Sequence, residues 1–463
     1  MKNIRKIVSV ALVTIMTLSF VGCNSSTSTD SNKESDNAEI SVQVSDDLVE
    51  NAKTFMNYFK NYNTDGMYVM TSEDFKAVVD KEKMEKQNKS LNKQLGKLQS
   101  YDNFRVVLDS GYKSVLVYSE FEKGTYDLKI SFTEDNKSIE GYSLQESTIE
   151  GEKADTKGYK GEAVTFGDEK YKSNGTLLVP KNKETKVPAV VLVHGSGPND
   201  RDETINGINK PFKDIAEGLA ENGIAVLRYD KRTYTYGTDL SQKEIEDITP
   251  EFEVLDDVAA AVDYLKSRNE IDQENIFVLG HSLSGYFLPL IYDKAPSVKG
   301  GISLAGTIAV PFEDLMKEQY DYLANYDGKV VDEEKTALEE FNESYNLVKD
   351  LKNGKAVDDK LILGMGQVYW NFLNNYNGLD QWDKISKPTL VLQGERDYQL
   401  PMENFETYKN KLADKDNFVF KSYKKLSHIF MKADSKPSPG DYTTQKKVED
   451  DVIKDISSWI KGE

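Results

Sequence analysis

Short apolar runs alternate with helical periodicity along the C-terminal two thirds of the chain. Apolar runs of strand length occur at Val187–Val193, 224–227, 276–279, 302–305 and 389–392. Between them, residues 212–219 and 252–265 repeat apolar side chains at the spacing of amphipathic helices. Strands that are apolar throughout are buried on both faces. The pattern therefore predicts an α/β fold, with a mostly parallel sheet between helices and a ligand site at the carboxyl ends of its strands.

Residues 46–150 carry a different pattern, with helices first and strands afterwards. One stripe at helical spacing consists of Leu48, Ala52, Phe55, Met56 and Phe59. A second helix is expected over 75–84, and the very polar run at 82–99 is expected to form an exposed or frayed helix. Short alternating segments follow at 104–108, 114–121, 126–132 and 139–144. We expect a small α+β domain here, with a polar linker at 151–161. It contains no histidine and no cysteine, so it is either a binding or spacer module with an unknown partner, or a packing unit alone.

The first residues have the composition of a targeting segment. Lys2, Arg5 and Lys6 precede a mostly apolar run at 7–20. This run has the length of a signal-peptide core and is too short to span a bilayer comfortably. The sequence that follows it ends in a cysteine and resembles the lipobox of bacterial lipoproteins: Phe20-Val21-Gly22-Cys23.

This resemblance implies a lipoprotein signal peptide at 1–22 and lipidation of Cys23. The next residues, 23–45, are rich in Ser, Thr, Asn and Asp, which is typical of a disordered tether. We therefore expect a lipid anchor in the membrane and a location on its extracytoplasmic face. The alternative is an ordinary signal peptide in which Cys23 is incidental.

Composition narrows the possible partners and cofactors. The 463 residues include 59 Lys and Arg against 78 Asp and Glu, a formal net charge of −19. A chain this acidic is repelled by phosphate backbones, so we expect no nucleic-acid partner. It has one cysteine and three histidines, too few for an intramolecular disulfide or a thiol zinc site. We therefore expect no metal.

The strongest chemical signal follows the predicted strand at 276–279 and reads Gly280-His281-Ser282-Leu283-Ser284-Gly285. Strand, tight turn and helix form the context of a nucleophile elbow, which presents a serine hydroxyl at the end of a strand. The turn needs small neighbours: Gly280 is one, and Ser284 stands where the motif has glycine. Ser282 is the candidate nucleophile, and a glycine–serine turn without a role is the alternative.

A serine nucleophile needs a base of near-neutral pKa, and imidazole is the usual one. His194 ends an earlier predicted strand, and His281 flanks Ser282 on the backbone. His428 lies late in the chain, in the loop after a predicted strand at 418–423. It is therefore the candidate base.

The acid that orients the base is expected between Ser282 and His428 in chain order. Asp397 follows the predicted strand at 389–392 and is the candidate. Glu395 is the alternative. The acid accepts the second imidazole N–H and stabilises the imidazolium.

Acyl transfer also needs N–H donors that stabilise the oxyanion. The backbone N–H of Leu283, at the start of the predicted helix, is one candidate. The second is expected from the loop after the first strand, where Gly195 and Gly197 allow the backbone to approach closely. Ser196 is the favoured donor and Gly197 the reserve.

Four motifs together resemble the α/β-hydrolase superfamily over residues 160–463, and more narrowly the secreted bacterial esterases and serine-aminopeptidase-like hydrolases. They are His-Gly-Ser-Gly-Pro at 194–198, Arg-Tyr-Asp-Lys-Arg at 228–232, Gly-His-Ser at 280–282 and Gln-Gly-Glu-Arg-Asp-Tyr-Gln at 393–399. The resemblance implies hydrolysis of small-molecule carboxylic esters through an acyl-enzyme, without a cofactor. The segment 46–150 resembles a small domain of unknown function that precedes some bacterial secreted hydrolases. Asp230, Lys231 and Arg232 are expected to be structural charge partners.

Residues 306–384 interrupt the predicted sheet and are expected to form a helical lid, with helices at 337–351 and 361–373. Some of its aromatic residues are expected to line an apolar pocket: Phe312, Tyr320, Tyr322, Tyr345, Tyr369, Trp370, Phe372 and Tyr376. Two alternatives to an esterase stay open. One is a peptidase or acyltransferase acting on the cell envelope, and the other is a non-catalytic binding protein with a hydrolase fold.

Overall fold

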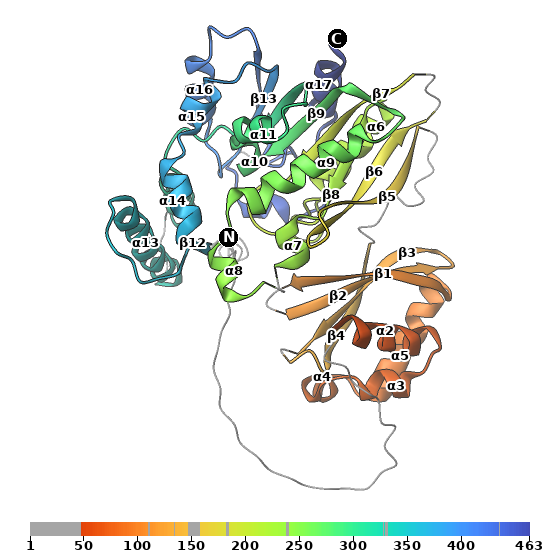
Figure 1. Ribbon diagram of the computed structural model, residues 1–463. Coiled ribbons are helices and arrows are strands. Elements are labelled where there is room, and N and C mark those ends of the chain that lie inside the picture. Colours follow the sequence, from red (N-terminus) through yellow and green to blue (C-terminus); the bar gives the residue numbers. More distant parts are fainter. Residues whose placement is uncertain are drawn as a thin grey trace. The chain divides into compact units, whose positions relative to one another are not determined.

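A computed structural model describes residues 48–109, 112–133, 135–146, 158–181, 185–237, 240–326, 328, 332–434 and 436–463. It divides the chain into two compact units, which are described separately (Figure 1). The expected signal peptide at 1–22, Cys23 and the tether at 23–45 lie outside the described residues. Within the described residues, no helix combines the length and apolar character needed to cross a membrane.

The described residues of the N-terminal unit form four helices followed by four strands. The helices are α2 (Leu48–Lys60), α3 (Thr64–Val69), α4 (Glu73–Val78) and α5 (Lys81–Leu95). The antiparallel sheet has the order β1 (Leu98–Asp109), β2 (Tyr112–Phe121), β3 (Gly124–Phe132) and β4 (Ile139–Glu146). The helix predicted over 75–84 is wrong in its bounds, because it ends at Val78, whereas the polar helix expected over 82–99 agrees with α5. Ser72 caps α4 and Asp80 caps α5, so two helices form.

The core of this unit lies between α2 and the sheet. Phe55 and Met56 of α2 are fully buried, as are Val115 and Val117 of β2. The apolar stripe predicted for 48–59 is thus the buried face of α2. Only Met84 is fully buried in α5, as its polar sequence requires.

The second unit is built on an eight-stranded sheet. Its strands, in spatial order, are β14 (Phe418–Tyr423), β13 (Thr389–Gly394), β10 (Gly300–Leu304), β9 (Ile271–His281), β7 (Val187–Val193), β8 (Ala225–Tyr229), β6 (Lys172–Pro180) and β5 (Tyr159–Gly167). The first six run parallel, whereas β6 and β5 pair antiparallel at one edge. The strands β5 and β6 were not predicted. Polar residues interrupt their apolar residues, and β5 begins inside the expected linker at 151–161.

Helices cover both faces of this sheet (Figure 1). One core cluster contains α6 (Pro211–Glu221) and α17 (Asp450–Lys461). The opposite cluster contains α9 (Asp256–Lys266), α11 (Leu288–Lys294) and α16 (Met402–Lys411). Shorter elements complete the body: α7 (Arg232–Tyr236), α8 (Gln242–Glu246), the π-helical turn η1 (Glu251–Leu255), α10 (Leu283–Tyr286) and the 3-10 turn η2 (Pro439–Tyr442). The predicted fold class, a mostly parallel sheet between helices preceded by a small α+β unit, is confirmed.

The segment between β10 and β13 contains further helices and a small hairpin. They are α12 (Phe312–Ala324), α13 (Asp332–Lys352), β11 (Leu361–Ile362), β12 (Met365–Gly366), α14 (Gln367–Asn375) and α15 (Gly378–Trp382). The helix predicted over 361–373 is wrong at its start, where β11 and β12 pair. Leu363 and Gly364 have positive φ angles of 48° and 76°, which turn the chain there. We call residues 312–382 the lid segment.

Candidate active site

The turn after β9 has the geometry of an elbow. Ser282 has φ 51° and ψ −115°, a conformation that non-glycine residues rarely adopt. Its N–H donates to the Leu304 carbonyl at 2.8 Å, which holds the turn against the end of β10. A Cβ atom at Gly280 would lie 2.5 Å from the Ser284 carbonyl oxygen. Glycine at 280 is therefore required by space.

Ser284 departs from the usual glycine without opening the elbow. Its side chain is fully buried, and its Oγ donates to the His194 carbonyl at 2.5 Å. The close approach falls on Gly285, where a Cβ atom would lie 2.7 Å from Ser303 Oγ. The position that must lack a side chain is thus 285 and not 284, and the Ser284 hydroxyl connects the elbow to the loop after β7.

His428 and Asp397 meet beside the elbow. His428 Nδ1 lies 2.6 Å from Asp397 Oδ2, and both side chains are buried. The carboxylate is fixed by three further donors. Asp397 Oδ1 accepts from the N–H groups of Gln399 and Leu400 at 2.8 and 2.9 Å, and Oδ2 accepts from Gln393 Nε2 at 3.0 Å. The arrangement holds the imidazole ring by one nitrogen.

Glu395, the alternative acid, does not take this position. Its side chain is exposed and accepts a hydrogen bond from Ser422 Oγ at 2.8 Å. Of the two candidates, the structure brings Asp397 to His428.

The candidate oxyanion loop after β7 lies against the elbow. Ser196, Gly197 and Leu283 line the same cavity as Ser282 and His428. The Gly195 peptide is held at both ends: its N–H donates to Glu203 Oε1 at 2.7 Å, and its carbonyl accepts from Lys231 Nζ at 2.7 Å. We call residues 194–198 the oxyanion loop.

A buried ion pair connects this loop to His428, the candidate base. Glu203 Oε2 lies 2.9 Å from His281 Nδ1, and His281 Nε2 lies 3.1 Å from the His428 carbonyl oxygen. Both ring nitrogens of His281 thus face acceptors, which favours the doubly protonated ring. Burial acts to lower the pKa of His281, but the Glu203 carboxylate outweighs it and the net pKa is raised. Burial acts to raise the pKa of Glu203, but His281 outweighs it and the net pKa is lowered.

The remaining charged groups around the site are structural, as expected. His194 lies against the rings of Phe212 and Tyr229, and burial lowers its pKa to about 4. Ion pairs at 2.6 Å connect Arg201 with Asp230, Lys231 with Glu253 and Arg232 with Asp257. The expectation that Asp230, Lys231 and Arg232 are charge partners therefore agrees with the structure.

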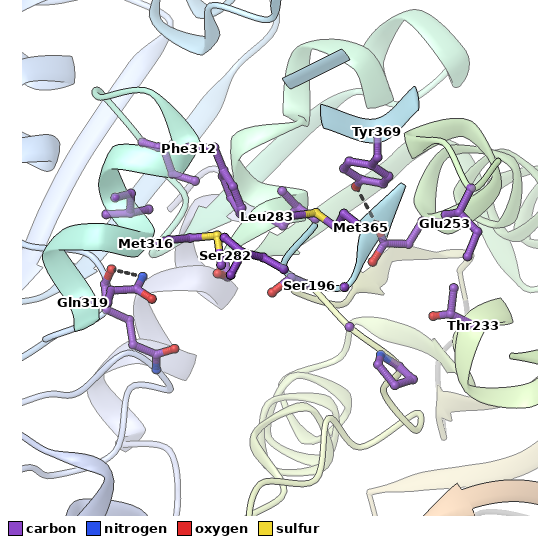
Figure 2. A pocket seen from close by; sticks show the side chains of 18 of the residues that line it. Ser196, Thr233, Glu253, Ser282, Leu283, Phe312, Met316, Gln319, Met365 and Tyr369 are labelled. Carbon is purple, nitrogen blue, oxygen red and sulfur yellow. Dashed lines mark hydrogen bonds between the residues drawn. The ribbon is translucent and has the colours of Figure 1, made fainter. Parts of the chain in front are cut away.

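Ser282 opens into a cavity of about 190 Å³ beneath the lid segment (Figure 2). Of the lid aromatics named from the sequence, Phe312 and Tyr369 line it, whereas Trp370 belongs to the adjoining core. Tyr369 donates a hydrogen bond to Glu253 at 2.6 Å.

Glu203, Glu253 and Thr233 were not predicted from the sequence. Glu203 and Thr233 lie in polar stretches between strands, and Glu253 lies on the polar side of the apolar pattern at 252–265, where most such side chains are solvated. The one available signal for Glu203 was its position shortly after the His-Gly-Ser-Gly-Pro motif. That position did not distinguish Glu203 from its acidic neighbours Asp200 and Asp202.

The model of the family described as serine aminopeptidase, S33, matches residues 187–434, more than half of the chain. The chain belongs to this family. Its N-terminal unit matches, over residues 52–141, a domain described only as a protein of unknown function. The expectation of an enzyme, a hydrolase with the α/β-hydrolase fold, is thereby confirmed.

Similar proteins include an esterase and a probable lactonase. Esterase EstD of Thermotoga maritima is 28% identical over 91% of this chain and 97% of its own length. A probable 2-oxo-3-(5-oxofuran-2-ylidene)propanoate lactonase of Bradyrhizobium sp is 28% identical over 27% of this chain and 47% of its own. Among solved structures, Est1E from Butyrivibrio proteoclasticus has a TM-score of 0.41 and 19% identity, covering 65% of this chain and 96% of that one. The expected class, a carboxylic ester hydrolase, agrees with EstD.

Proposed function

We propose that this chain hydrolyses small-molecule carboxylic esters, with Ser282 as nucleophile, His428 as base and Asp397 as orienting acid. The observation that carries the proposal is the 2.6 Å contact between His428 Nδ1 and Asp397 Oδ2, beside a cavity that His428 and Ser282 both line. This contact commits one imidazole N–H to the carboxylate and leaves Nε2 as the basic nitrogen. The similarity to EstD supports esters as the substrate class.

In the first half of the reaction, His428 takes the hydroxyl proton of Ser282 while Oγ attacks the ester carbonyl carbon. The N–H groups of Leu283 and Ser196 stabilise the oxyanion. Leu283 suits this role because it is the first residue of α10, and the N–H groups of a first helical turn have no intrahelical acceptor. The carbon–oxygen bond to the alcohol then breaks. The alcohol leaves with the proton from His428, and the acyl group stays on Ser282.

In the second half, a water molecule gives one proton to His428 and its oxygen attacks the acyl carbon. The bond between that carbon and Ser282 Oγ breaks, and the proton returns to the serine. One ester and one water molecule thus become one acid and one alcohol, and the steps require no cofactor. Glu203 and Lys231 act here as positioning residues, since both hold the peptide of Gly195.

A peptidase or an acyltransferase would use the same acyl-enzyme and differ only in the leaving group or the acceptor. The description of the family as aminopeptidases favours testing peptides beside esters. A binding protein without activity would keep the fold and leave Ser282 unreactive.

The decisive experiment is labelling of the protein with a fluorophosphonate probe, followed by mass spectrometry. We expect label on Ser282, lost in Ser282→Ala and in His428→Ala. Ser457→Ala removes another buried serine hydroxyl, in α17 and outside the cavity, and serves as the matched control. Absence of label on a folded sample would contradict the proposal. Rates on aryl esters and on peptide amides would then assign the substrate class.

We further propose that the enzyme is anchored at the extracytoplasmic face of the membrane by lipid on Cys23. The support is the charged start, the apolar run at 7–20 and the position of the only cysteine. Fractionation of expressing cells tests this proposal. We expect the protein in the membrane fraction with a lipidated N-terminal peptide, and release of Cys23→Ser from that fraction. Equal membrane retention of both proteins would refute the anchor.

A further inference from the structure

The cavity beside Ser282 has a polar end that the proposed reaction does not use. The polar groups there are Thr233, Glu253 and Tyr369, and apolar side chains such as Ile248 and Met365 surround them. Figure 2 shows this polar end on one side of Ser282, and Phe312, Met316 and Gln319 on the other. The cavity therefore extends from the nucleophile in two directions of different character.

Glu253 is a carboxylate whose charge is already balanced. Its Oε1 accepts from Lys231 Nζ at 2.6 Å, and its Oε2 accepts from the Tyr369 hydroxyl at 2.6 Å. Each carboxylate oxygen has a second acceptor site, so the group can accept further hydrogen bonds. Glu253 also lies in the π-helical turn η1, and such turns occur frequently at functional sites.

Thr233 supplies the second observation. Its side chain is 5% exposed, and its Oγ1 has no hydrogen-bond partner among the described residues. Buried hydroxyl groups are nearly always paired, because an unpaired one lowers stability. Thr233 also belongs to the wall of the cavity, so a ligand at this end is the nearest source of the missing partner.

The order of the strands shows which part of an ester reaches this end. His428 and Asp397 follow β14 and β13, on one side of β9, whereas Thr233 follows β8, on the other side. His428 must reach the leaving alcohol to protonate it, so the alcohol lies on the β13 side. The acyl group then extends toward Thr233 and Glu253.

We propose that this end of the cavity is a recognition site for a hydroxyl group at the far end of the acyl chain, so that the preferred substrates are esters of short hydroxy acids. The inference rests on the proposed ester hydrolysis. A hydroxyl is both donor and acceptor: it donates to Glu253 and accepts from Thr233. The cavity, about 190 Å³, is comparable with the roughly 150 Å³ cavity known to hold benzene, so the acyl chain is short.

Charge excludes the other polar groups. An ammonium group would bring a second cation beside Lys231, which already balances Glu253. It would also have no acceptor to offer to the Thr233 hydroxyl proton. A carboxylate would be repelled by Glu253. A neutral hydroxyl completes the hydrogen bonds through one atom without adding charge.

The test compares three homologous series of methyl esters, made from ω-hydroxy acids, from unsubstituted acids and from ω-amino acids, by titrating the acid released. We expect the hydroxy ester to have the highest kcat/KM at one or two chain lengths. In Thr233→Val, this preference should fall about ten-fold or more, because the variant keeps the shape and loses the hydrogen bond. The kcat/KM for unsubstituted esters is measured on the same variant, so that the preference is a ratio within each protein.

Thr307→Val is the matched control, since Thr307 Oγ1 is also buried without a partner among the described residues but does not line the cavity. It should keep the wild-type preference. A preference for the amino ester, equal rates for all series, or a preference that survives in Thr233→Val would overturn the inference while leaving ester hydrolysis intact. If no series is hydrolysed and Ser282 takes no fluorophosphonate label, the proposed function fails and the inference fails with it.

Discussion

Glu203→Gln isolates the buried charge that connects the oxyanion loop to the base. The substitution keeps the shape of the side chain and an acceptor for the Gly195 N–H, but removes the charge opposite His281. Both side chains are buried, at 3% and 5% exposure. Breaking a buried pair by neutralising one partner costs about 3–5 kcal/mol, because the other group loses its counter-charge and must either stay charged and unpaired or give up its proton. We expect a loss of that size in the free energy of unfolding at about pH 5.5, where an unfolded histidine, with a pKa of about 6.5, is protonated.

The loss must depend on pH, and its sign follows from the two pKa directions. The pKa of His281 is raised in the folded wild type, so above about pH 6.5 the folded state binds a proton that the unfolded state has released. Wild-type stability therefore falls as pH rises, by at most about 1.4 kcal/mol per pH unit, until His281 is deprotonated. Without its counter-charge, buried His281 is neutral in the variant. The difference between wild type and Glu203→Gln is thus greatest between about pH 4.5 and 6.5 and narrows above that range.

Urea unfolding followed by tryptophan fluorescence measures this difference. All three tryptophans, Trp370, Trp382 and Trp459, belong to the second unit, so the signal reports on the unit that holds the site. The double variant with His281→Gln is the control, since it removes both charges and should recover part of the stability. A difference in the free energy of unfolding that stays constant from about pH 5.5 to about pH 8.5 would refute the charged pair.

Three further predictions concern the acid, the oxyanion loop and the lid segment. Asp397→Asn should lower kcat by about 10³- to 10⁴-fold without unfolding the protein, measured on an aryl ester, because the amide cannot stabilise the imidazolium. Lys231→Met should lower the free energy of unfolding in urea by about 3–5 kcal/mol, because it leaves the buried Glu253 carboxylate without its counter-charge. Adding Glu253→Gln should restore that stability but not kcat, since the Gly195 carbonyl still lacks its donor. Gly366→Ala should destabilise by about 1–3 kcal/mol and lower kcat/KM, because its Cβ would overlap the Glu246 carbonyl oxygen; unchanged values would contradict that packing.

Apolar periodicity was sufficient to predict the buried part of the fold. The segments expected for β7, β8, β9, β10, β13 and β14 each overlap the strand that the structure shows. The strand β5 lies at the edge of the sheet and alternates buried with exposed residues, and β6 beside it interrupts its apolar residues with polar ones, so neither has a continuous apolar run along its length. The hairpin at 361–366 was taken for helix, because a positive φ at Leu363 has no signature in a leucine.

Chain order was sufficient to predict the three candidate catalytic residues, but not the residues that hold them in position. Ser282, Asp397 and His428 each follow a strand of one parallel sheet, so strand prediction alone placed them at one edge. Glu203 and Glu253 act through contacts with residues distant in the chain, and one sequence without its fold shows no such pairing. His281 was set aside as a neighbour of the nucleophile, although its ring contacts the carbonyl of the base residue.

The site thus divides into a fixed part and a variable part. Glu203, His281 and Lys231 connect loops at this edge of the sheet by buried charges, and these contacts hold the oxyanion loop and the loop that carries His428. The lid segment instead supplies cavity wall, through residues such as Phe312 and Tyr369. The Tyr369 hydroxyl connects the two parts, because it donates to Glu253, the ion-pair partner of Lys231. Substitutions in the lid segment should therefore change which acyl group is accepted, whereas substitutions in the charge network should change the rate for every substrate alike.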